Sequence, residues 1–189
     1  MQSSCTKKFI IILGIGCGML TAFIIYYSYF SGFLPGRICQ FDPAWDTQPI
    51  LDIFKNNWHS LVEGKDYSPE FMMKNRTPGT DPKYFGALKI KVMREGRRLA
   101  GFITYYMKRS GEGEVVLLAV GESFRGKRYG YALMQYAMKD LFLMGARSVA
   151  LWVLVDNAPA RKIYKELGFV EKFFDAKREN VYLEYHFTG

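Results

Sequence analysis

The chain has 189 residues, enough for one domain of ordinary size, and its 26 Lys or Arg against 18 Asp or Glu give a formal net charge of +8 at pH 7. The charges are interspersed rather than gathered in blocks, and no nucleic-acid-binding motif occurs, so a nucleic-acid partner is not expected. All cysteines lie before residue 40, and His59 and His186 are isolated in the sequence, so no metal site is expected either.

Residues 9–34 contain no charged side chain and are mostly apolar. Such a stretch of about 26 residues is long enough to cross a hydrocarbon core as a helix. Aromatic residues cluster at its C-terminal end, as in an interfacial belt: Tyr26, Tyr27, Tyr29, Phe30 and Phe33. We therefore predict a tail at 1–8, a transmembrane anchor at 9–34 and a domain at 37–189.

A cleaved signal peptide is the alternative reading of this segment, because Lys7 and Lys8 precede the apolar run. That run is too long for a signal peptide, and no small-residue cleavage site precedes Pro35. Gly14 and Gly18 have the spacing of a helix-dimer motif, which allows for an oligomer.

The first half of the domain is expected to form a short strand at 38–41 and a helix that Asp46 or Thr47 caps. The helix should run to about Glu63, because apolar residues recur at helical spacing: Ile50, Leu51, Phe54, Trp58, Leu61 and Val62. Ser68-Pro69-Glu70 predicts a second helix start, and residues 75–83 predict a loop.

The second half alternates between strands and helices. A hairpin at 87–94 and 99–107 turns at Glu95-Gly96, and a strand at 115–120 follows. Further elements are predicted at 131–144 (helix), 148–155 (strand), 158–166 (helix) and 169–175 with 180–187 (strand pair). This order predicts an α+β fold with a mixed sheet.

A basic turn, RGKRYG at 125–130, connects the strand at 115–120 to the following helix. A strand that feeds such a turn at a helix start favours an anion, because free backbone N–H groups and the helix dipole attract negative charge. Taken alone, the pattern is as typical of a solvated loop before a surface helix.

A second segment, at residues 157–169, makes the interpretation of this turn more specific. Asn157 is followed by Ala160, Tyr164 and then Leu167-Gly168-Phe169. Together with the turn, and with the hairpin before it, this frame resembles the GNAT superfamily of N-acetyltransferases, which use acetyl-CoA. The resemblance covers about residues 87–170. One departure is Arg128, which stands where the family usually has a glycine and must tolerate the geometry of the turn.

The resemblance implies a GNAT-like mixed sheet flanked by helices, which splays apart near Val120 where the pantetheine arm of the cofactor enters. It also implies which residues bind the cofactor: Leu118, Ala119, Val120, Arg125, Gly126, Lys127, Arg128, Tyr129, Gly130 and Asn157.

For catalysis, Tyr164 is the expected general acid, since a phenol can protonate a departing thiolate. The alternative is that Tyr164 only packs the helix onto the sheet. Glu171 is the candidate base, because it follows the Leu-Gly-Phe motif where ribosomal-protein alanine acetyltransferases carry a catalytic Glu. Glu114 and Glu122 are rivals, a surface role is the alternative for each, and a water chain could also serve.

The expected function is an acetyl-CoA-dependent N-acetyltransferase, tethered to a membrane, that acts on a primary amine of a protein or small molecule. A non-catalytic, membrane-tethered CoA-binding, sensing or scaffold domain is the alternative. Lys7 and Lys8 favour a cytoplasmic N-terminus, which would export the domain. Because acetyl-CoA is cytosolic, we nevertheless expect a single-pass protein with a cytosolic domain.

Overall fold

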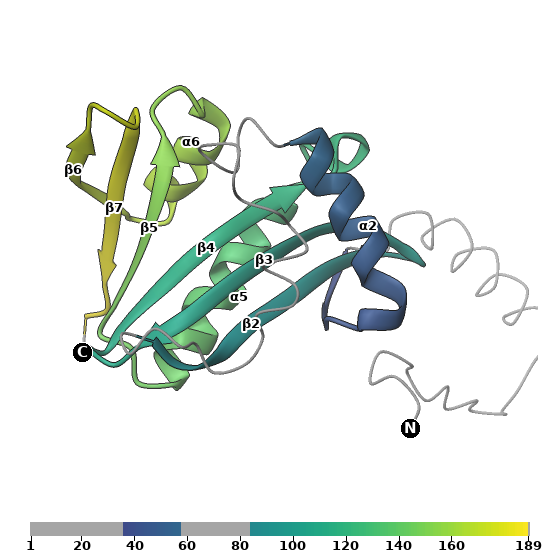
Figure 1. Cartoon of the computed structure of the whole chain (residues 1–189), viewed down its shortest axis with the longest axis horizontal. Coiled ribbons are helices and arrows are strands. Elements are labelled where there is room, and N and C mark those ends of the chain that lie inside the picture. The colour runs from purple at the N-terminus through teal and green to yellow at the C-terminus, as the bar shows by residue number, and fades with distance from the viewer. Residues whose placement is uncertain (1–35, 58–83, 189) are drawn as a thin grey trace, which may run out of the picture.

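The computed structural model describes residues 36–57 and 84–188, and side chains from residue 88 in the second range (Figure 1). The predicted anchor at 9–34, the helix start at Ser68 and the loop at 75–83 lie outside these ranges. Within the two ranges, no helix has the length and apolar character to span a membrane.

Apart from the short 3-10 helix η1, the described elements follow one another in the order that the sequence predicts, and the first helix ends at Asn56 instead of near Glu63. They are β1 (Arg37–Gln40), α2 (Pro43–Asn56), β2 (Tyr84–Glu95), β3 (Arg98–Lys108), β4 (Glu112–Val120), η1 (Glu122–Phe124), α5 (Tyr129–Leu143), β5 (Ser148–Leu154), α6 (Ala158–Glu166), β6 (Val170–Asp175) and β7 (Asn180–His186). The α+β class with a mixed sheet is confirmed.

The strands form one sheet in the order β1-β2-β3-β4-β5-β7-β6. Every neighbouring pair is antiparallel except β4 and β5, which run parallel. This parallel pair is short, because it extends only from Glu112↔Ser148 to Val115↔Leu151. Beyond it the two strands diverge, and the sheet opens between them (Figure 1).

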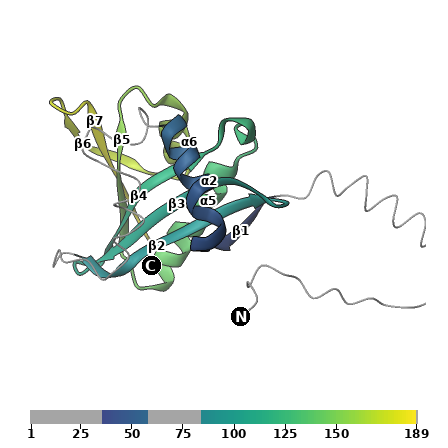
Figure 2. The ribbon, with the colours of Figure 1, turned by 45° about the vertical axis from the view of Figure 1, so that its right-hand side comes forward.

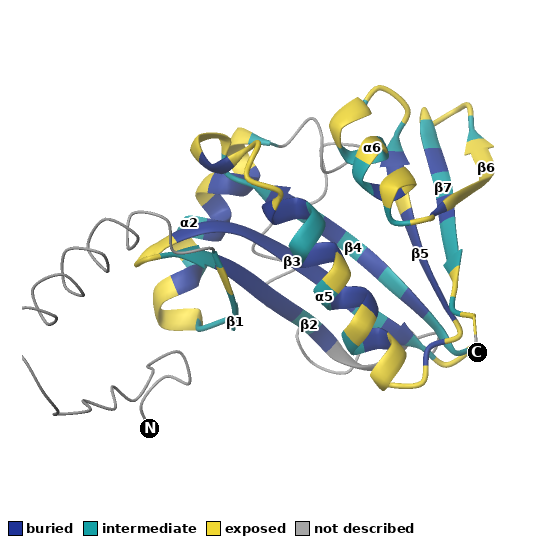
Figure 3. Ribbon diagram, turned by 180° about the vertical axis from the view of Figure 1, so that it is seen from behind, coloured by how far each residue is buried: buried dark blue, intermediate teal, exposed yellow. Residues whose placement is uncertain are grey.

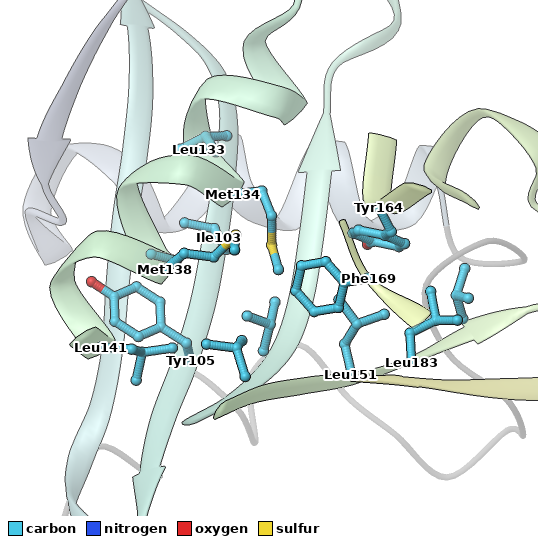
Figure 4. Packing of buried hydrophobic residues seen from close by; sticks show 14 of the residues in the cluster. Ile103, Tyr105, Leu133, Met134, Met138, Leu141, Leu151, Tyr164, Phe169 and Leu183 are labelled. Atoms are coloured by element: carbon cyan, nitrogen blue, oxygen red, sulfur yellow. The ribbon is translucent and has the colours of Figure 1, made fainter. Parts of the chain in front are cut away.

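Helices cover both faces of the sheet (Figures 1 and 3). On one face, α2 buries Ile50, Ile53 and Phe54 against the strands β2 to β4. On the other, α5 and α6 enclose the larger cluster, part of which is drawn in Figure 4. Burying these apolar surfaces on both faces stabilises the sheet and holds the start of α5 and the whole of α6 beside the opening.

The predicted cap of α2 is wrong. The N-cap is Asp42, whose carboxylate accepts from the backbone N–H of Ala44 at 3.0 Å, and Pro43 occupies the first turn. Asp46 lies one turn further on, accepts from the N–H of Asp42 at 2.8 Å, and is buried in an ion pair with the partly exposed Arg94 of β2. Asp46 thus lies inside the helix and pairs with a residue far away in the sequence, and the cap is the acid one turn before it.

Candidate functional site

The opening between β4 and β5 begins at a bulge in β4. Val115 pairs with Tyr105 and Leu117 with Thr104, so Val116 is an extra residue in β4 at the point where the ladder to β5 ends. From there β4 stays paired with β3 as far as Val120, while no described strand pairs with its other edge. The sheet therefore splays about five residues earlier than the expected position near Val120.

Leu118, Ala119 and Val120 therefore lie on the part of β4 whose edge toward β5 has no hydrogen-bonded strand among the described residues. Backbone N–H and C=O groups at such an edge seek partners, and an extended ligand with amide groups can supply them. The three predicted cofactor-binding residues of β4 thus lie where a pantetheine-like chain could add to the sheet.

The basic turn lies between η1 and α5. The first bond of α5 runs from the N–H of Ala132 to the carbonyl of Arg128 at 3.0 Å, so the N–H groups of residues 129–131 precede the ladder at the helix N-terminus. Gly126 has φ +78°, and nothing lies within 4 Å of the position that a Cβ would take there. The helix start therefore has backbone donors outside its ladder, and the turn before it has open space where Gly126 lacks a side chain, an arrangement typical of anion sites.

Arg128 is the N-cap of α5 and adopts the left-handed conformation, with φ 59° and ψ 18°. Glycine occupies this region most easily, which explains why a glycine is usual at this position in the family that the sequence resembles. Arg128 tolerates the geometry, and the turn keeps its form. Its guanidinium pairs with Glu166 of α6 at 3.3 Å and lies 4.4 Å from the ring centre of Tyr131.

The other side chains of the turn also have partners. Arg125 donates to the side chain of Asn57 at the end of α2. Lys127 donates to both carboxylate oxygens of Glu95, each at 2.9 Å, and the hydroxyl of Tyr129 donates to the same carboxylate. Hydrogen bonds from Tyr129 and Lys127 lower the pKa of Glu95, while burial and then Glu95 raise the pKa of Tyr129.

Gly130 is buried in the first turn of α5 and lies against α6. A Cβ at this position would sit 3.2 Å from Cδ1 of Ile163 and 3.7 Å from Cγ2 of Val120. The missing side chain therefore allows α5, α6 and the end of β4 to approach closely. Packing is a reason for glycine here that the sequence pattern did not reveal.

Asn157 is the N-cap of α6, where its side-chain oxygen accepts from the backbone N–H of Ala160 at 3.2 Å. Pro159 stands in the first helical turn, a position where its missing donor costs nothing. The Asn157 frame thus begins the helix that carries Arg161 and Tyr164.

Tyr164 is buried in the core beside Phe169, with ring centres 5.9 Å apart (Figure 4). Burial raises the pKa of its phenol well above the ordinary value of 10. Among the described residues, the Tyr164 hydroxyl has no hydrogen-bond partner, and its surroundings are apolar. The raised pKa keeps the phenol protonated at neutral pH, as a proton donor requires.

The candidate bases lie apart from one another. Glu171 is on the edge strand β6, with its side chain 56% exposed, and forms an ion pair with Arg161 at 2.5 Å. Glu114 on β4 pairs with Lys108 at 2.9 Å, and Glu122 is exposed in η1. Within residues 36–57 and 84–188, no His, Cys, Asp and Glu side chains group as a metal site would require.

An aromatic row near the opening was missed by the sequence analysis. Trp152 is the first β5 residue after the last pair with β4, and its ring centre lies 5.0 Å from that of Tyr182 and 6.1 Å from that of Phe173. The hydroxyl of Tyr182 donates to Glu112 at 3.2 Å. Strand register brings these residues together from three strands, so only the pairing could have revealed the row.

Comparisons with known proteins agree with this geometry. The sequence model described as "Acetyltransferase (GNAT) family" matches residues 48–169. A mycothiol acetyltransferase of Corynebacterium efficiens is 29% identical over 116 residues, which are 60% of this chain and 36% of that protein. An N-alpha-acetyltransferase of Sulfurisphaera tokodaii is 40% identical over 77 residues, 38% of this chain and 46% of that protein. The chain thus spans less than half the length of either relative.

Solved structures share the fold. Ard1 from Thermoplasma volcanium superposes with a TM-score of 0.66 at 23% identity, covering 82% of this chain and 100% of that one. The PaiA N-acetyltransferase from Thermoplasma acidophilum, solved in complex with coenzyme A, gives a TM-score of 0.63 at 16% identity with the same coverage.

Proposed function

Since the chain belongs to the acetyltransferase (GNAT) family, we propose that it is an acetyl-CoA-dependent N-acetyltransferase that acts on a primary amine. The observation that carries the proposal is the junction at β4. One strand supplies both an open backbone edge after Val116 and the lead into the turn before α5. The two parts of an extended thioester cofactor, its amide-bearing arm and its pyrophosphate, find complementary groups along this path.

The turn would hold the pyrophosphate mainly through backbone. The N–H groups at the start of α5 and the backbone of Gly126, which has no side chain, can approach the phosphate oxygens, whereas the side chains of Arg125, Lys127 and Arg128 already have partners. These cations add a favourable field around the site. Leu118, Ala119 and Val120 would bond the pantetheine amides, and Asn157 would act indirectly, by starting α6.

In the reaction, the amine nitrogen attacks the thioester carbonyl that acetyl-CoA supplies. A carbon–nitrogen bond forms, the carbon–sulfur bond breaks, and the thiolate leaves with the electron pair. Tyr164 would give its phenolic proton to that sulfur, and the proton that the attacking nitrogen loses as the amide forms would return to Tyr164 through solvent. Its raised pKa keeps the phenol protonated at neutral pH, so it serves as an acid and not as the base.

The base that takes the proton from the ammonium would be Glu171, with Glu114, Glu122 or a water chain as rivals. The ion pair with Arg161 fixes the position of the Glu171 carboxylate on β6. From that position, Glu171 would take the proton of the ammonium either directly or through a bridging water. Substituting Glu171→Gln, Glu114→Gln and Glu122→Gln separately sorts them, because loss of the base lowers kcat by about 10²-fold or more and changes the acidic limb of the pH–rate profile.

The protein would be a single-pass membrane protein whose anchor is residues 9–34 and whose domain faces the cytosol, where acetyl-CoA is found. The length and apolar character of this segment support the anchor. The acceptor would be a primary amine of a protein or small molecule. The printed names of the relatives, a mycothiol acetyltransferase and an N-alpha-acetyltransferase, favour neither class over the other.

A non-catalytic CoA-binding, sensing or scaffold domain is the second candidate, because Glu171 is engaged by Arg161. The test uses the full chain in lipid nanodiscs, with calorimetry for CoA binding and mass spectrometry for acetylated products from a panel of amines. Binding with an acetylated product supports the enzyme. Binding with no product from any amine supports the second candidate, and no binding at millimolar CoA overturns both.

A further inference from the structure

The point where the chain enters the domain lies against the start of α5. A Cβ on Gly36 would come within 2.9 Å of Cε1 of Tyr129, so the first described residue packs directly on that ring. β1 then pairs with the end of β2, with Arg37 opposite Arg94. Residues 9–34 are thus joined to the domain beside the β2–β3 hairpin turn and the phosphate turn.

Exposed cations gather at this end of the molecule. Arg98, opposite Glu95 in the hairpin, lies 4.7 Å from the ring centre of Phe124, and Lys127 lies 5.7 Å from the same ring. These contacts connect the hairpin to the phosphate turn. We call the resulting patch the basic end, and its exposed cations are Arg37, Arg97, Arg98, Arg125 and Lys127.

The carboxylates near the basic end compensate only part of its charge. Glu95 is bonded by Lys127 and Tyr129, Asp46 is buried and paired with Arg94, and Glu122 is exposed next to Phe124. Arg37 and Arg97 form no ion pair with any residue that the structure describes. The patch therefore keeps an excess of positive charge that faces solvent.

The opposite end of the molecule differs. The β6–β7 turn lies far from the β2–β3 hairpin (Figures 1 and 2). It also carries two cations, Lys177 and Arg178, but Arg178 is paired with Asp175 at 3.8 Å and no predicted anchor adjoins it. The basic end is thus distinguished by where the chain enters as well as by its charge.

We propose that the basic end docks on anionic lipid headgroups and so holds the cofactor turn close to the membrane surface. This inference rests on the anchor in the proposed function. Only Pro35 separates residue 34 from Gly36, and two residues of extended chain reach about 7 Å. That reach is shorter than the Debye length of about 8 Å at physiological salt, so Gly36 and the adjoining Arg37 would lie inside the field of an anionic leaflet, with the other cations of the basic end facing the same side.

Anionic lipid explains the patch better than the cofactor phosphates alone. Arg37, Arg97 and Arg98 come from β1 and from the hairpin, and none belongs to the turn that would hold the pyrophosphate. Together they widen the positive surface around the point of entry, as expected for a surface that meets a plane of headgroups.

The test compares full-length protein in nanodiscs of phosphatidylcholine with protein in nanodiscs that also contain phosphatidylserine, using hydrogen exchange without CoA. Exchange at residues 96–98 should be slower by about fivefold or more with phosphatidylserine, the factor for one cation at an anionic surface. High salt should remove the difference. Residues 176–179 in the β6–β7 turn should exchange equally in both lipids.

Variants separate docking from folding. Arg97→Glu and Arg37→Glu, each on an exposed side chain, should lose most of the lipid-dependent protection, whereas the matched variant Lys177→Glu should keep it. Equal exchange at 96–98 in both lipids, in protein that is firmly inserted, overturns docking and leaves the anchor intact. Release of the full chain from the membrane by carbonate overturns the anchor and this inference together, while acetyl transfer is measured independently of both.

Discussion

The hydroxyl of Tyr129 donates a hydrogen bond to Glu95, which lies 34 positions earlier in the chain. Tyr129 is the first residue of α5 and Glu95 is the last of β2, so this bond ties the hairpin to the helix start that would bind pyrophosphate. Lys127 completes the link by donating to both oxygens of the same carboxylate.

The Glu95 link predicts a pH dependence of stability. Because the pKa of Glu95 is lowered in the folded state, its contribution is present above the ordinary pKa of 4.5 and is lost as pH falls through the folded value. Wild type should therefore melt at a higher temperature than Glu95→Gln at pH 7, and the gap should shrink toward pH 3. Glu122→Gln, an exposed carboxylate of the same region, should show little gap. A constant Glu95 gap across this range would contradict the assignment.

Tyr164→Phe should leave stability almost unchanged, because the hydroxyl bonds to no described residue and the ring stays in place. If the hydroxyl protonates the thiolate, turnover should fall by about 10²-fold or more with little change in CoA affinity. Thiol release and melting temperature measured on the same sample check both points. Near-normal turnover, with chemistry shown to be rate-limiting, would remove Tyr164 from the mechanism and leave a packing role.

Gly130→Val should destabilise the fold by about 1–3 kcal/mol, because a side chain there meets Ile163 across the helix contact. A loss of CoA affinity in this variant would therefore be ambiguous. The pair Gly130→Ala and Gly130→Ala/Ile163→Val resolves it, since the second change removes the methyl group that the new Cβ would touch.

If Gly130 also allows the phosphate to approach, the double variant should regain stability relative to Gly130→Ala yet bind CoA about tenfold more weakly than wild type, as calorimetry would show. The single variant Ile163→Val is the reference for both readings. Normal affinity in the double variant would mean that Gly130 serves packing alone.

Arg128→Gly should stabilise the chain by about 0.5–1 kcal/mol or leave it unchanged, because glycine adopts φ 59° without steric cost. The lost pair with Glu166 offsets little of this gain, since both side chains are exposed to solvent. Lys127→Gly, with no positive φ to relieve, should destabilise instead. Denaturant unfolding compares the two, and a clear loss of stability in Arg128→Gly would show that the side-chain contacts of Arg128 outweigh its backbone strain.

Local signals in the sequence predicted some elements closely. The bounds of α6 agree with the prediction because Asn157 caps its start, Pro159 suits its first turn, and Gly168, at φ +87°, follows its end. The strands of the β2–β3 hairpin were found for a similar reason, since Gly96 marks their turn.

Features set by contacts between distant segments could not be predicted in this way. Nothing near Asp46 indicates its pairing with Arg94, and nothing near Val116 shows that β5 leaves β4 there. The partnership of Glu95 with Tyr129 depends on how α5 packs on the sheet, and the meeting of Trp152 with Tyr182 depends on strand register. The candidate site residues could thus be predicted from the sequence motif, whereas the residues that they contact could be identified only from the fold.

The short ladder between β4 and β5 has a mechanical consequence. Among the described strands, the ladder that joins the two antiparallel halves of the sheet extends over Glu112–Val115 and Ser148–Leu151, and β4 continues for five residues beyond it. Those five residues span about 17 Å at the usual rise of an extended strand. A rotation of β4 by about 5° at Val115 would move Val120 by about 1.5 Å over that length. A small change in the angle between β4 and β5 would therefore change the width of the opening near Val120.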